Sequence, residues 1–101
     1  MRIDTSNYGD DPRSGERPAA EYVAALLSDV GLDVELIESQ PGRTSVFARV
    51  AGQDSSLPAL LLHGHLDVVP AEASDWSMPP FGGEIADDHG VPMLWGRGAI
   101  D

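Results

Sequence analysis

The chain has 101 residues, of which 42% are apolar, a length that suits one small domain with a core of its own. Its 17 acidic residues outnumber its 6 basic ones, and the net charge of -11 repels phosphate backbones, so we expect no nucleic-acid partner. The longest apolar run, at residues 60–62, is far shorter than the ~20 residues of a transmembrane helix, and cysteine is absent. We therefore expect no membrane span, no disulfide and no thiolate metal site, as in a cytoplasmic protein.

The first expected element is a helix that follows an opening loop. Residues 4–15 are rich in Asp, Ser, Asn, Gly and Pro, which predicts a loop. Ser14 is a candidate N-cap for the helix, and Gly31 is a candidate C-cap. Apolar residues recur at helical spacing between them and predict one buried stripe, made by Ala20, Val23, Ala24, Leu27 and Val30.

Three strands are expected after the helix. Residues 32–37 and 45–50 alternate apolar and polar side chains, and Pro-Gly at 41–42 predicts a turn between them. Residues 60–62 are three leucines without alternation, which predicts a strand buried on both faces, as in the middle of an α/β sheet.

The remaining residues predict a loop and a hairpin. Residues 71–83 contain Pro-Pro and Gly-Gly pairs and should form an ordered loop. Residues 84–87 and 93–95 flank His89 and Gly90, a pattern typical of a hairpin turn. The order of elements indicates an α/β fold of which this chain is the beginning.

The side chains best suited to chemistry follow the predicted central strand, at the end where ligands collect in open α/β sheets: His63, His65 and Asp67. If the strand continued, these three would point to one side, and Asp67 would reach the ring of His65. A carboxylate in that place fixes the tautomer of a metal-bound histidine and raises its basicity. A hydrogen-bonded structural histidine is the simpler alternative, and a His63–His65 pair that chelates one metal is another.

Two motifs resemble those of one enzyme family. The run His-Gly-His-Leu-Asp-Val-Val-Pro at residues 63–70 closely resembles the first metal motif of the M20 family of metallopeptidases, and Trp-Gly-Arg-Gly-Ala-Ile-Asp at residues 95–101 resembles its second. The resemblance implies that His65 binds one zinc ion, that Asp67 is the catalytic carboxylate that orients His65, and that Asp101 bridges two zinc ions. Co²⁺ or Mn²⁺ could replace Zn²⁺. His63 does not match a ligand position.

The resemblance also implies a fold and an activity. Residues 1–101 would be the amino-terminal part of a mixed-sheet zinc-exopeptidase catalytic domain with flanking helices. The general base, the other ligands and an inserted domain that closes the site or forms homodimers would lie downstream. The whole enzyme would hydrolyse an amide bond in a small peptide or N-acyl amino acid with a water activated by two zinc ions, whereas residues 1–101 alone would be inactive. The alternative is a non-catalytic binding or interaction module derived from the same family.

Other notable side chains are expected to have structural roles. The glycines of the second motif should admit close backbone approach, and Arg97 should form structural hydrogen bonds. Trp76 and Phe81 resemble an aromatic loop of the family and should pack. His89 should be exposed in its turn.

Overall fold

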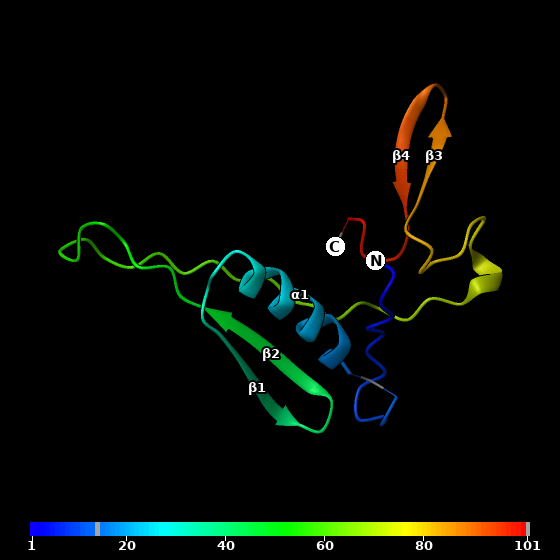
Figure 1. Ribbon diagram of the computed structural model, residues 1–101. Coiled ribbons are helices and arrows are strands. Elements are labelled where there is room, and N and C mark those ends of the chain that lie inside the picture. Colours follow the sequence, from blue (N-terminus) through cyan, green and yellow to red (C-terminus); the bar gives the residue numbers. More distant parts are fainter. Residues whose placement is uncertain (14, 101) are drawn as a thin grey trace. The chain divides into compact units, whose positions relative to one another are not determined.

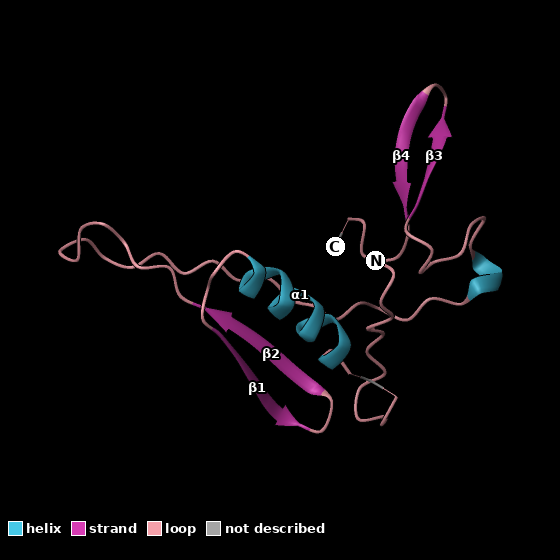
Figure 2. Cartoon of the chain, viewed as in Figure 1, coloured by secondary structure: helices cyan, strands magenta, loops and turns pink. Residues whose placement is uncertain are grey.

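The computed structural model describes residues 1–13 and 15–100. The chain divides into two compact units: Met1–Gly15 together with Asp67–Asp101 form the first, and Glu16–Leu66 form the second. The second unit contains helix α1 and strands β1 and β2, and the first contains a 3₁₀ turn and strands β3 and β4 (Figure 1). Long loop stretches connect these elements (Figure 2).

Helix α1 spans Arg17–Asp29 and confirms the predicted helix. Pro18 lies in its first turn, where a missing N–H costs no hydrogen bond. Gly31 ends it with a φ of 84°, and its N–H donates to the Ser28 carbonyl at 2.8 Å, as expected of a C-cap glycine. Val30 is 73% exposed, so its place in the buried stripe was wrongly predicted, and the predicted N-cap Ser14 lies outside the described residues.

Strands β1 (Val34–Gln40) and β2 (Arg43–Ala48) form an antiparallel hairpin and confirm the first two predicted strands, although their bounds differ from the expected ones. Gly42 in the connecting turn has a φ of 81°, which glycine adopts without strain. Helix α1 lies along the hairpin and contacts both strands (Figure 1). Ala20, at the centre of this packing, is completely buried.

The start of α1 is tied to the turn of the hairpin. The backbone N–H groups of Glu16 and Arg17 both donate to the Gly42 carbonyl, at 2.9 and 3.1 Å. Arg43 Nε donates to Glu16 Oε2 at 2.9 Å, and Glu16 is only 7% exposed. A buried carboxylate is costly without a partner, so this ion pair stabilises one oxygen of Glu16 where the helix meets the sheet, whereas Oε1 is buried without a hydrogen-bond partner among the described residues.

The predicted central strand at residues 60–62 is wrong. Leu60, Leu61 and Leu62 are 82%, 80% and 81% exposed and belong to an irregular stretch. A strand buried on both faces needs a neighbour on each side, but β1 and β2 pair with each other and no described residue pairs with residues 60–62. The described architecture is therefore a helix with two small antiparallel sheets, mixed in α and β content.

Strands β3 (Glu84–Asp88) and β4 (Val91–Trp95) form the second hairpin, as predicted. His89 and Gly90 connect them with φ values of 54° and 87°, the left-handed pair that matches the twist of a tight hairpin. The loop before β3 holds the 3₁₀ turn Ala73–Asp75. Among the described residues, no helix has the length and apolar character needed to cross a bilayer.

Candidate functional site

The carboxyl end of the first motif is held by the beginning of the chain. Ser6 and Val68 form a parallel bridge, in which Val68 N donates to the Thr5 carbonyl at 3.1 Å and Asn7 N donates to the Val68 carbonyl at 2.9 Å. Thr5 and Ser6 are each 4% exposed. The described part of residues 4–15 is a loop, as expected, and its one bridge, at Ser6, fixes the backbone that carries Asp67.

Asp67 is half-buried and receives a hydrogen bond from this segment. Asn7 Nδ2 donates to Asp67 Oδ2 at 2.8 Å, and Asn7 Oδ1 accepts the Gly9 N–H at 2.9 Å. Sequence reasoning missed Asn7. The Asn-x-Gly spacing indicates a local turn, but nothing in the sequence links Asn7 to an aspartate 60 residues away.

The histidines of the first motif are both exposed. The boundary between the two units falls after Leu66, so His65 belongs to the second unit and Asp67 to the first. Asp101 lies outside the described residues. The assignments of His65 and Asp101 as ligands and of Asp67 as their carboxylate partner stay predictions.

The first motif contributes imidazole and carboxylate side chains. Imidazole and carboxylate groups are the donor types that zinc binds in a protein without cysteine. A catalytic zinc ion usually needs three protein ligands, and no cluster of three or more His, Asp or Glu side chains suited to a metal occurs within residues 1–13 and 15–100. The described residues alone therefore do not provide a catalytic zinc site.

The two motifs meet in the first unit through a glycine. Gly98 has a φ of 79°, and a Cβ at this position would lie 3.0 Å from Val68 Cγ1. Gly96 is similarly confined, because a Cβ there would lie 3.2 Å from the Pro80 carbonyl oxygen. Both observations confirm that the second motif uses glycine for close approach. Gly98 thereby brings the second motif against the residue that follows Asp67.

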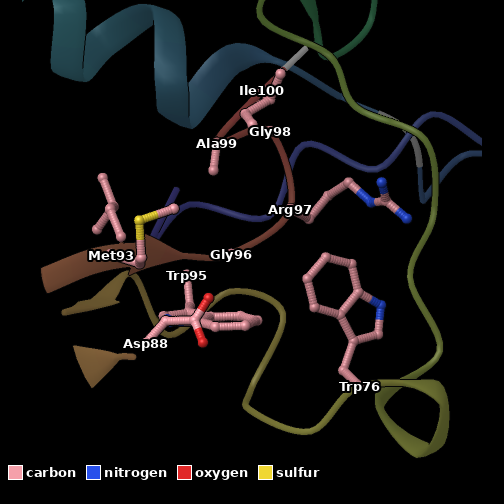
Figure 3. Close-up of a pocket in the computed structure, with 10 residues that line it drawn as sticks. Trp76, Asp88, Met93, Trp95, Gly96, Arg97, Gly98, Ala99 and Ile100 are labelled. Atoms are coloured by element: carbon pink, nitrogen blue, oxygen red, sulfur yellow. The ribbon is translucent and has the colours of Figure 1, made fainter. Parts of the chain in front are cut away.

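Arg97, between these glycines, lies on an aromatic ring. Its guanidinium lies over the Trp76 ring, 5.0 Å from the ring centre (Figure 3). Its backbone N–H donates to the Pro80 carbonyl at 2.6 Å. Its Nε is buried without an acceptor among the described residues, so the side-chain hydrogen bonds expected of Arg97 are replaced by a cation–π contact. The packing role of Trp76 is confirmed. Both residues line a hollow of about 290 Å³, together with Met93 and Trp95.

His89 has the exposed position expected of it. Its side chain is 97% exposed and lies 3.6 Å from Asp88. The pKa of Glu38 lies below its usual value because the Gly42 backbone N–H, and then the Arg17 guanidinium, donate to the carboxylate.

Comparison with known proteins finds similar curated proteins. No family model and no solved structure matches the chain. A succinyl-diaminopimelate desuccinylase of Wolbachia from Brugia malayi is 37% identical over 84 residues, which is 82% of this chain and 20% of that protein. One from Cereibacter sphaeroides is 39% identical over 87 residues, or 85% of this chain and 21% of the relative. A probable succinyl-diaminopimelate desuccinylase of Staphylococcus epidermidis is 36% identical over 87 residues, or 85% and 20%. The chain spans about a fifth of the length of these curated relatives.

Proposed function

We propose that this chain is the amino-terminal part of the catalytic domain of an M20-family, metal-dependent amide hydrolase that removes a succinyl group from an amino nitrogen. The similarity to desuccinylases, at 36–39% identity over 82–85% of the chain, carries the proposal. The contact between Gly98 and Val68 supports it, because within the first unit the end of the first motif, from Asp67 onward, lies against the second motif.

The chain would contribute one end of the metal site. His65 would bind a metal ion through its exposed imidazole, and Asp67 would orient that imidazole while Asn7 holds the carboxylate. Asp101 would be the bridging ligand. Zinc, when bound, supplies a water of lowered pKa and a Lewis acid for the carbonyl.

The rest of the site would come from the complete protein. The described residues contain no set of three donors, so we expect residues 1–101 alone to bind zinc weakly and to hydrolyse no amide. Cobalt or manganese could take the place of zinc. A chelating His63–His65 pair is the competing arrangement within the same function, since both imidazoles are exposed.

The test is hydrolysis by the complete gene product. The protein is supplied with an N-succinyl amino acid, an N-acetyl amino acid and a dipeptide, before and after removal of metal with a chelator. We expect the N-succinyl compound to be cleaved fastest, the activity to be lost on chelation, and added Zn²⁺ or Co²⁺ to restore it. Activity that is indifferent to the chelator, or no cleavage of any of the three amides, would contradict the proposal and favour a non-catalytic module.

A further inference from the structure

We propose that Asn7 is a positioning residue that sets the orientation of the carboxylate of Asp67, the group to which the proposed function gives a role in the metal site. The inference rests on the proposed function and adds to it a residue that neither motif contains. Its first support is the hydrogen bond of 2.8 Å from Asn7 Nδ2 to Asp67 Oδ2.

Both the nitrogen and the oxygen of the Asn7 side-chain amide form hydrogen bonds. Its Oδ1 accepts the backbone N–H of Gly9 at 2.9 Å, which requires oxygen at that position, so the nitrogen must face Asp67. The side chain is therefore fixed as an acceptor toward its own turn and as a donor toward the carboxylate. A side-chain amide held by two hydrogen bonds rotates less freely than an exposed amide held by one.

Backbone pairing at the bridge keeps the side chains of Asn7 and Asp67 next to each other. Each residue is the chain neighbour of a bridge partner, since Asn7 follows Ser6 and Asp67 precedes Val68. The hydrogen bonds of the bridge, at 2.9 and 3.1 Å, tie the segments together directly beside the side-chain bond. Ser6 is 4% exposed, so little water reaches the pairing.

The chemistry of the donor suits this role. A carboxylate can turn about its last torsion, and a donor bound to one oxygen restricts that rotation and so sets the direction of the other. The amide of asparagine is neutral, so it orients Asp67 without bringing a cation that would compete with the metal site for its negative charge. A carboxylate partner of a metal-bound histidine needs a fixed orientation and a full negative charge.

The test compares matched variants of the complete gene product. Asn7→Asp replaces the donor by an oxygen of nearly the same shape and keeps an acceptor for Gly9. We expect its zinc affinity, measured by chelator competition well below the unfolding midpoint, to fall about tenfold, the lower end of the effect of losing an outer partner of a metal ligand. Gln53→Glu adds the same charge at an exposed position and should leave the affinity unchanged.

The double variant Asn7→Asp with Asp67→Asn separates positioning from simple stability. It restores an amide–carboxylate pair with the roles reversed, so we expect the unfolding midpoint to recover toward that of the wild type. Zinc affinity should stay low, because residue 67 is no longer an anion. Wild-type affinity in Asn7→Asp, or equal losses in Asn7→Asp and Gln53→Glu, would overturn the role of Asn7 alone. A wild-type protein that binds no metal would overturn the proposed function and this inference together.

Discussion

The segment from α1 to β2 and the segment that follows it are neighbours in sequence but differ in structure. Helix α1 contacts both β1 and β2, which pair with each other, and Ala20 in the helix is completely buried. Residues 49–65 are exposed throughout, including five large apolar side chains that are 67–82% exposed: Val50, Leu57, Leu60, Leu61 and Leu62. Both segments are apolar, so apolar content does not separate them.

The difference is the availability of a partner surface. Helix α1 has an apolar stripe, and the hairpin that contacts the helix follows a few residues later, so the two elements pack on each other. Residues 60–62 are all leucine, so a strand there would be apolar on both faces. Burial of such a strand requires a neighbouring strand on each edge and a packed layer on each face. The described residues provide none of these to the leucines.

The largest expected effect is a difference in stability between substitutions at two leucines. Leu27→Ala should lower the free energy of unfolding by about 2 kcal/mol, because Leu27 is half-buried in the stripe of α1. Leu61→Ala should change it by less than about 0.5 kcal/mol, because an exposed side chain leaves no cavity. Urea unfolding of both variants checks the contrast, and equal losses would break the comparison.

A second test removes the ion pair that joins α1 to the hairpin. Arg43→Met should cost about 1–2 kcal/mol, since Glu16 is left as a largely buried carboxylate without its partner, and partial exposure of Arg43 limits the loss. Arg13→Met breaks the exposed pair with Asp11 and a cation–π contact with Tyr8, and it should cost less than Arg43→Met because water screens the exposed pair. Thermal unfolding of the two variants measures the difference, and a larger loss in Arg13→Met would contradict it.

A smaller effect on stability is expected when the contact between Gly98 and Val68 is disturbed. Gly98→Ala should destabilise the protein by about 1 kcal/mol or more, because a Cβ would meet Val68 and the φ of 79° is strained for alanine. Gly52→Ala is the control, since its nearest contact would be an ordinary 4.0 Å. The denaturant midpoints of the Gly98→Ala and Gly52→Ala variants measure the two losses of stability. Equal midpoints would show that the contact between the motifs does not depend on this close approach.

The smallest effect concerns acid stability. The pKa of Glu38 is lowered in the folded chain by the Gly42 N–H and by Arg17, so its contribution to stability is present above its unfolded pKa of about 4.3 and is lost as the pH falls through the folded pKa. Glu38→Gln should therefore flatten the decline in unfolding midpoint below about pH 4.3. A decline as steep as that of the wild type would show that this carboxylate carries no acid-sensitive stability.

Sequence reasoning succeeded where the signals are local. The helix, the Gly31 cap, the Pro-Gly turn and the His89–Gly90 turn each depend on residues close together in the sequence, and all four appear as expected, although Val30 is not part of the buried stripe. The glycines of the second motif were also correctly interpreted.

It failed where a partner lies far along the chain. The leucines at 60–62 gave a strand signal, but a strand exists only beside other strands. The bond from Asn7 to Asp67 crosses 60 residues and has no local signature. For the same reason the metal site could be inferred only in part, since a ligand set is assembled by the tertiary fold.

Metal content of the complete gene product tests the central claim most directly. Elemental analysis of the purified wild type, His65→Ala and His63→Ala should show zinc bound by the wild type, a marked loss in His65→Ala, and wild-type content in His63→Ala. Equal losses in the two variants would replace the assignment by a His63–His65 pair. A wild type that holds no metal, or zinc content unaffected by His65→Ala, would contradict the account.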